Sequence, residues 1–231
     1  MVPGYVVDNF TKKWNKRIRV TKNFGYWGGY KTAWTWLHKL RVAMVRTGRD
    51  KLNGTVEIDE AFIGGKQSGG KRGRGTNNKV LVTIAVETGE KKMGRVRFGV
   101  IPDASSESLE NFLHESVEPG STVITDGWKG YSRIKQLGYR HKISDKKPKL
   151  LDEDTVLPNA HLVISLLKRW IMGTLQGSLS DQHIKYYLDE FTFRFNRRTS
   201  GNRGMLFYRL IEQAAEIEPV VYDVIKDRKS A

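Results

Sequence analysis

Two adjacent carboxylates stand near the end of the segment 54–65, GTVEIDEAFIGG. Apolar residues occupy alternate positions of it, Val56, Ile58 and Phe62. This alternation predicts a strand with one apolar face, and such a strand sends Asp59 and Glu60 to opposite faces, so one of them points into any given site. A carboxylate on a rigid strand suits a divalent cation, because Mg²⁺ prefers oxygen ligands in strict geometry. From this segment alone, an acid pair that faces solvent is an equal alternative.

A second candidate carboxylate, Asp126, ends a short apolar segment and precedes a Gly-Trp turn that should lead into another helix. The patterns also predict strands at 80–87, 95–100, 121–125 and 139–143, and a helix from Asp103 to Pro119. The order β-β-β-α-β-α resembles the layout of an RNase H-like domain. Because the first and fourth strands lie side by side in that layout, Asp59 and Asp126 could meet across the sheet. The alternative for Asp126 is a plain turn-forming role.

A third set of polar residues lies on a helix predicted from Pro158 to Gly173. His161 and Lys168 are two helical turns apart and share one face, with Ser165 between them. A histidine near a helix start is usually structural, but the lysine two turns on weighs against a purely structural role here.

The composition points to a polyanionic partner. The 231 residues carry 40 Lys and Arg against 25 Asp and Glu, a net charge of +15, with a pI near 9.9. No apolar run is long enough to span a bilayer and no signal peptide is visible, so nucleic acid is favoured over a membrane. The absence of cysteine excludes disulfides and thiolate zinc sites. We therefore expect a cytoplasmic, nucleoid-associated protein.

Basic residues gather in two further segments. Residues 9–49 contain eleven of them, no acid and several interleaved aromatics. A helix is predicted over 31–45, with Ala33, Trp36, Leu37, Leu40, Ala43 and Met44 on its apolar face and Lys39 and Arg41 outside it. After a Gly-rich turn, this helix fits the second half of a helix-turn-helix; the alternative is a basic helix packed on the main domain. His38 is expected at the surface or on a phosphate.

The glycine-rich segment 66–79 carries five basic residues and is predicted to be a loop along a phosphate backbone, or else a solvated hairpin loop. Candidate DNA-binding residues from both segments are Lys31, Lys39, Arg41, Lys71, Arg72 and Arg74. The last third, 180–215, is helical by pattern, with Phe207 and Ile211 among its core positions and Glu190 paired with Arg194.

Taken in order, several motifs resemble bacterial insertion-sequence transposases of the DDE, RNase H-like type, over roughly residues 25–215. The motifs are KTAW from Lys31, VEIDE from Val56 with Gly64-Gly65, IPDAS from Ile101, TDGW from Thr125, SLLKRW from Ser165 and YLDEFTFRFNRR from Tyr187. Relatives in the same branch carry a cysteine-rich zinc ribbon before the helix-turn-helix. This chain has none, so we expect an N-terminally truncated or frame-disrupted copy.

The resemblance implies an α/β fold, an RNase H-like mixed sheet flanked by helices and preceded by a small helix-turn-helix-like segment. It implies that Asp59 and Asp126 hold metal, that His161 takes the third position and that Lys168 binds phosphate; Asn159 is the rival of His161. The expected cofactor is Mg²⁺ or Mn²⁺, as two ions. Glu60 would act beside the metal ligands.

The implied activity is metal-dependent cleavage and strand transfer at the ends of an insertion sequence, on double-stranded DNA, by a homo-oligomer. The expected organisation is a DNA-binding segment at 1–50, a catalytic domain at 51–215 and a charged tail at 216–231. The alternative is an inactive relative that only binds DNA. An RNA-binding protein would explain the charge but not Asp59 and Asp126.

Overall fold

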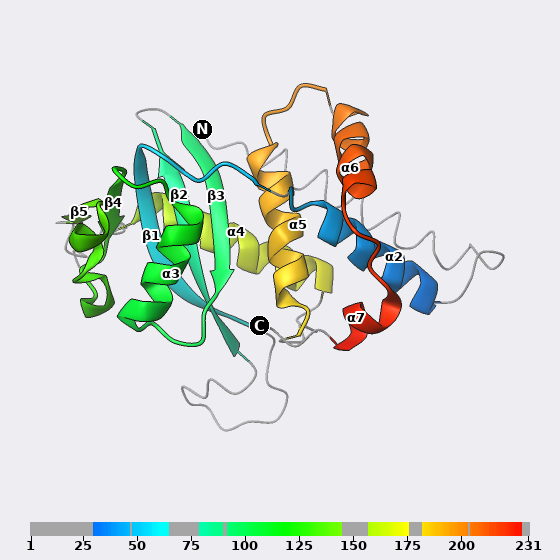
Figure 1. Cartoon of the computed structure of the whole chain (residues 1–231), viewed down its shortest axis with the longest axis horizontal. Coiled ribbons are helices and arrows are strands. Elements are labelled where there is room, and N and C mark those ends of the chain that lie inside the picture. The colour runs from blue at the N-terminus through cyan, green and yellow to red at the C-terminus, as the bar shows by residue number, and fades with distance from the viewer. Residues whose placement is uncertain are drawn as a thin grey trace.

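The structure, a computed structural model, describes residues 30–46, 48–64, 79–89, 92–144, 157–175, 182–202 and 204–227. Figure 1 shows a sheet at one end of the molecule and a group of helices at the other. The elements in chain order are α2 (Tyr30–Ala43), β1 (Thr55–Gly64), β2 (Lys79–Thr88), β3 (Met93–Val100), α3 (Ser106–Ser116), β4 (Thr122–Thr125), the 3₁₀ turns η1 (Lys129–Tyr131) and η2 (Ile134–Leu137), β5 (Arg140–Ile143), α4 (Pro158–Leu175), α5 (Ile184–Asn196), α6 (Gly204–Glu216) and α7 (Tyr222–Asp227).

The five strands form one mixed sheet in the order β3-β2-β1-β4-β5. β1, β2 and β3 pair antiparallel as a meander, whereas β4 lies parallel to β1 and β5 lies parallel to β4. The predicted meander, the fifth strand and the position of the fourth strand beside the first are therefore confirmed. This order and these directions are those of an RNase H-like sheet.

Both faces of β1 are covered, whereas the alternation predicted one apolar and one polar face. Val56 and Ile58 pack with α3 in one core. Ile63 points the other way, into a second core built with α4 and α5. Phe62, predicted on the apolar face, is 48% exposed. The alternation misled because the face toward α4 carries buried polar groups, which a hydrophobicity pattern reads as solvent-facing.

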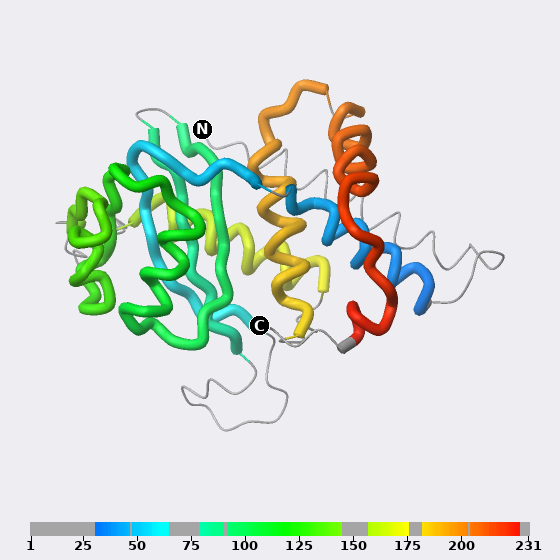
Figure 2. Tube along the Cα trace, viewed as in Figure 1, coloured from blue at the N-terminus to red at the C-terminus, as the bar shows by residue number. Residues whose placement is uncertain are grey.

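The helical end of the molecule forms around α2, which packs against α5, α6 and α7 (Figure 2). A small core joins Ala43 of α2 to Phe193 of α5 and Leu210 of α6. Glu190 of α5 binds Arg41 at 2.8 Å and Arg194 at 3.2 Å, which confirms the predicted Glu190–Arg194 pair. The alternative of a helix packed on the main domain thus describes α2 better than a separate segment does.

Three expectations for α2 are wrong. Trp36, predicted in the core, is 62% exposed, while Arg41, predicted outside the apolar face, is buried against Glu190. His38 is fully buried among aromatic rings rather than at the surface. The reason is that the buried side of α2 is closed by an ion pair and aromatic contacts, so hydrophobicity alone assigns the wrong face. The helix also ends at Ala43, two residues earlier than predicted.

Expectations for the segments after Asp126 also need correction. Short 3₁₀ turns, not a full helix, follow Asp126. Phe207 and Ile211 of α6, predicted in the core, are exposed. The segment after Pro219, predicted as a charged tail, contains α7, whose Ile225 is fully buried. No helix in the described ranges has the length and apolar character needed to cross a membrane.

Candidate active site

Parallel pairing between β1 and β4 brings the two predicted acids together. The register joins Thr55 to Thr122 and Glu57 to Ile124. Carried two residues further at the same offset, it sets Asp126 opposite Asp59. Asp126 is exposed just past the end of β4, and its Oδ1 accepts a hydrogen bond from Trp128 N at 2.9 Å, which closes the turn. Their charges interact, since Asp126 acts to raise the pKa of Asp59.

Asp59 also faces the start of α4. Its Oδ1 accepts a hydrogen bond from Glu60 N at 2.9 Å, and its Oδ2 lies 3.2 Å from His161 Nε2. The Asp59 side chain is 16% exposed and that of His161 is 45% exposed, so the pair is open to solvent from the histidine side. Burial raises the pKa of Asp59, against the opposing effects of His161 and, further away, Lys168.

The first turn of α4 is anchored by a residue that the sequence reading passed over. Glu57 is 5% exposed and accepts hydrogen bonds from Asn159 Nδ2 at 2.8 Å and Ala160 N at 2.9 Å. A carboxylate at a helix N-terminus accepts hydrogen bonds from backbone N–H groups that have no partner within the helix, and its negative charge interacts favourably with the helix dipole. Asn159 is therefore engaged with Glu57, while His161, two residues on, reaches Asp59.

Glu60 lies on the opposite face of β1 from Asp59, as the strand alternation predicted. Its Oε1 accepts a hydrogen bond from the Tyr131 hydroxyl, and Tyr131 is fully buried in η1. Burial raises the pKa of Glu60 to about 7, with smaller contributions in the same direction from Asp59 and Asp126. The hydrogen bond therefore ties β1 to the turn that follows Asp126. Sequence reasoning missed Tyr131, although it sits in the same Gly-Trp-Lys-Gly-Tyr run as Asp126.

Lys168 lies on the exposed side of α4, as do His161 and Ser165. Two turns of helix separate His161 from Lys168, about 10 Å along the axis. The positive charge of Lys168 is close enough to favour the ionised form of Asp59 and so acts to lower its pKa. The predicted grouping of histidine and lysine on one face, toward Asp59, thus matches the geometry.

The donor types at this centre suit a hard divalent cation. Asp59 and Asp126 offer carboxylate oxygens and His161 an imidazole nitrogen, a combination that Mg²⁺ and especially Mn²⁺ accept. Burial raises the pKa of Asp59, and a cation bound beside it would favour the ionised carboxylate. Among the described residues, however, no three His, Asp or Glu side chains are close enough together to enclose one ion in this arrangement.

The predicted DNA-binding residues differ in their exposure to solvent. Lys31 is exposed at the start of α2, with its Nζ 3.9 Å from the Tyr222 ring centroid, and Lys39 is half-buried beside Trp36. Arg41 is not available to DNA, because it is buried and bound to Glu190. The remaining three, Lys71, Arg72 and Arg74, lie outside the described residues, as does the first half of the predicted helix-turn-helix.

Two comparisons with known proteins gave matches. The profile of the ISXO2-like transposase domain family matches residues 51–196, which include all the residues of the centre. Among solved structures, the chain is similar to the catalytic core domain of BIV integrase, with 15% sequence identity and a TM-score of 0.39, over 71% of this chain and 97% of that one. No curated protein sequence matches the chain.

Proposed function

The chain belongs to the ISXO2-like transposase domain family, and from this premise we propose that it is the transposase of an insertion sequence. It cleaves DNA at the ends of the element and joins those ends to a target by metal-dependent phosphoryl transfer. The observation that carries the proposal is the convergence of Asp59 with His161 at 3.2 Å, beside Asp126 across the parallel β1–β4 pair.

Asp59, Asp126 and His161 are the proposed holders of Mg²⁺ or Mn²⁺, with two ions as the expectation. When bound, such ions activate the attacking hydroxyl and stabilise the leaving oxygen. The fixed bond from Glu60 N to Asp59 Oδ1 leaves Oδ2 directed at His161, so the chain itself orients one ligand oxygen. Neutral His161 adds a ligand without adding a further negative charge to an acidic centre.

Lys168 is the proposed contact for the phosphate beside the scissile bond. It shares the exposed side of α4 with His161 and carries a positive charge toward Asp59. A cation held there stabilises the charge that develops on the phosphoryl oxygens. Glu60 has a different role: hydrogen bonded to Tyr131 and with a pKa of about 7, it holds the turn after Asp126 against β1.

The test is cleavage of duplex DNA that carries the terminal repeats found beside the gene, with Mg²⁺ or Mn²⁺ and with a chelator. We expect nicking that requires the metal and is abolished by Asp59→Asn and by Asp126→Asn, while both variants remain folded. DNA binding without any metal-dependent cleavage would instead identify an inactive DNA-binding relative. Cleavage that survives in both variants would remove Asp59 and Asp126 from the centre.

A further inference from the structure

Three arginines from separate parts of the chain border the small core that joins Ala43 of α2, Phe193 of α5 and Leu210 of α6. Arg46 lies in the link between α2 and β1, Arg197 follows the last turn of α5, and Arg209 lies on α6. The positive charges of Arg209 and Arg46 both act on Arg197. Arg46 and Arg209 are exposed and Arg197 is half-buried. We call these three residues the arginine surface.

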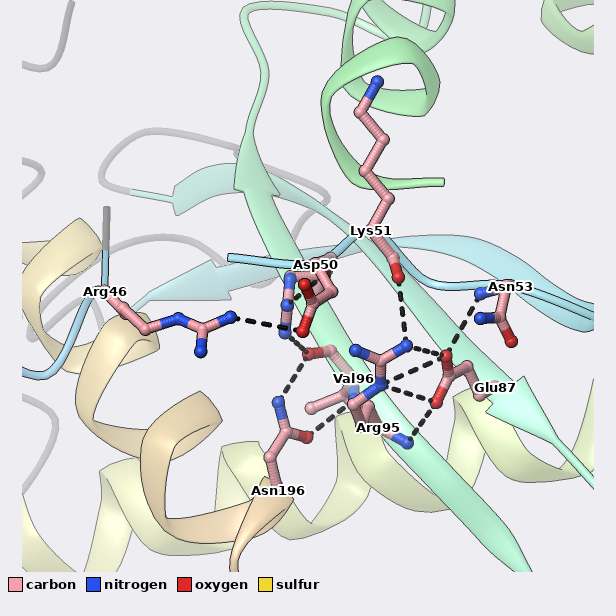
Figure 3. A network of polar contacts seen from close by, with 9 residues as sticks. Arg46, Asp50, Lys51, Asn53, Glu87, Arg95, Val96 and Asn196 are labelled. Atoms are coloured by element: carbon pink, nitrogen blue, oxygen red, sulfur yellow. Dashed lines mark hydrogen bonds and ion pairs between the residues drawn. The ribbon is translucent and has the colours of Figure 1, made fainter. Parts of the chain in front are cut away.

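The arginine surface is held on rigid supports. Asn196, next to Arg197, accepts a hydrogen bond from Val96 N at 2.7 Å and donates one to Val96 O at 3.1 Å, so the end of α5 is fixed to β3 (Figure 3). The guanidinium of Arg197 stacks 3.9 Å from the Phe193 ring centroid. The position of Arg197 is therefore set by the fold.

Nearby acids do little to neutralise this charge. Asp50 binds Arg46 at 3.1 Å, but both side chains are largely exposed and such a pair is weak. Glu87 is already occupied by Arg95 at 2.6 Å and by Asn53 N at 3.1 Å, as Figure 3 shows. Glu212 of α6 lies three residues after Arg209, where an exposed pair of this kind is again weak.

The like charges are under mutual repulsion. Burial lowers the pKa of Arg197, and the charges of Arg209 and Arg46 lower it further. A bound anion relieves this repulsion, and arginines suit phosphate oxygens in particular. The ligand chemistry that fits is therefore a chain of phosphates rather than a single small anion.

The arginine surface is remote from the candidate active site. Arg46 precedes β1, whereas Asp59 lies four residues inside that strand, about 13 Å beyond its first residue. Because β4 is parallel to β1, Asp126 follows the same direction, toward the end of the sheet away from the arginines. In Figure 1 the link from α2 to β1 passes the C-terminal end of α5.

We propose that the arginine surface binds the phosphate backbone of a segment of duplex DNA that does not pass through the cleavage centre. The inference rests on the proposed function, because a transposase must hold DNA beyond the bond that it cuts. It assigns to the α5–α6 end of the molecule a role that neither the acidic centre nor the basic N-terminal segment supplies.

The first test removes charge from this surface. We compare the intact chain with Arg46→Gln/Arg209→Gln by measuring the affinity for a labelled duplex across a KCl series. Each lost phosphate contact lowers the slope of log affinity against log salt by about 0.9, so we expect a reduction of about 1.8. The matched control is Lys135→Gln/Lys185→Gln, which removes the same charge from exposed residues of η2 and the start of α5.

The conservative variant Arg46→Lys/Arg209→Lys keeps the charge and should keep a slope close to that of the intact chain, which separates charge from a folding defect. An unchanged slope in Arg46→Gln/Arg209→Gln, or an equal reduction in the control, overturns the proposal. None of these measurements depends on cleavage, so an inactive active site leaves the result intact. The failure of this inference is thus distinguishable from the failure of the proposed function.

The second test asks whether DNA lies beside α6. Because the chain contains no cysteine, one introduced cysteine is a unique attachment point for an iron chelate that generates hydroxyl radicals. Tyr208, which precedes Arg209 and is 65% exposed, is the position for Tyr208→Cys. We expect cutting of bound duplex from this position and none above background from Gln136→Cys on η2. Absence of cutting from Tyr208→Cys overturns the proposal.

Discussion

His161 and Asn159 lie in the same turn of α4 but contact different carboxylates, Asp59 and Glu57 respectively. We expect His161→Ala to lower metal-dependent cleavage at least about 10-fold, the scale of losses at groups that support a metal site, while salt-sensitive DNA binding persists. His161→Glu should retain more activity, since a carboxylate also binds Mg²⁺. Cleavage assays at equal folded fraction provide the measurement.

Asn159→Ala is the matched control, and its effect should appear in stability rather than in the cleavage rate per folded molecule. If Asn159→Ala abolishes cleavage and His161→Ala does not, Asn159 holds the third position instead. Lys168→Ala, assayed beside them, should slow cleavage without weakening metal binding.

Tyr131 is the residue whose hydroxyl satisfies Glu60 in a buried position. Tyr131→Phe leaves that carboxyl without its donor, so we expect the free energy of unfolding to fall by about 1–3 kcal/mol. The pKa of Glu60 should also rise, because the hydrogen bond from Tyr131 acts to lower it. Urea unfolding measures the first effect; Tyr208→Phe, at an exposed tyrosine, is the control and should be neutral.

Because His38 is buried, we expect the protein to lose stability as the pH falls. Burial, followed by the charges of Arg41 and His183, lowers its pKa from 6.5 to about 3, and neither ring nitrogen has a hydrogen-bond partner. In the unfolded chain His38 therefore becomes protonated below pH 6.5, whereas in the folded chain it stays neutral until the pH falls to about 3. Its contribution to stability is complete above pH 6.5 and falls by up to about 1.4 kcal/mol per pH unit below it.

Replacing the ring tests this directly. His38→Phe should flatten the pH dependence of the free energy of unfolding between pH 6.5 and 3, whereas His114→Gln, at an exposed histidine of α3, should leave it unchanged. Equal pH profiles for His38→Phe and the intact chain would contradict the assignment.

At the scale of elements, the start of α4 depends on Glu57. This carboxylate accepts the Ala160 backbone N–H and the Asn159 amide, and it is almost fully buried. Glu57→Gln keeps the size but loses the charge at the helix N-terminus, and we expect it to lower the free energy of unfolding by about 1–3 kcal/mol. Metal-dependent cleavage should fall as well, since α4 carries His161. Chemical denaturation and a cleavage assay measure the two effects.

The sequence predicts the elements of the sheet better than the faces of the elements. Alternation and turn residues locate the strands, and the order of elements is enough to expect Asp59 beside Asp126. The same patterns fail where polar groups are buried: Glu57 looks solvent-facing, and Arg41 looks like a DNA contact. Their partners, Ala160 and Glu190, are more than a hundred residues away in the chain, and no local pattern reports such pairs.

At the scale of the molecule, α2 is packed into the folded domain, against α5, α6 and α7. A chain that begins at Lys51 loses Arg41 and the apolar contacts of Ala43 with Phe193. We expect it to be less stable than a chain that begins at Tyr30 by about 3–5 kcal/mol, the scale for breaking a buried ion pair. Thermal unfolding of the two chains is the measurement.

The DNA affinity of both chains should then be compared across a salt series, at temperatures where each is folded. Equal slopes would mean that α2, with Lys31 and Lys39, contributes no phosphate contact. Equal unfolding temperatures would contradict the packing of α2 on α5 and α6.

The parallel partner of β1 has a consequence for how the chain is made. β1 is the first strand to be synthesised. One of its edges pairs with β2, which follows it, and the other edge stays unpaired until β4, which begins at Thr122. At synthesis rates of 5–20 residues per second, that edge stays uncovered for about 3–12 s. An open strand edge invites pairing with other chains. Slow translation between β1 and β4 should therefore favour aggregation, and a chain released before α4 lacks the helix that carries His161 and Lys168.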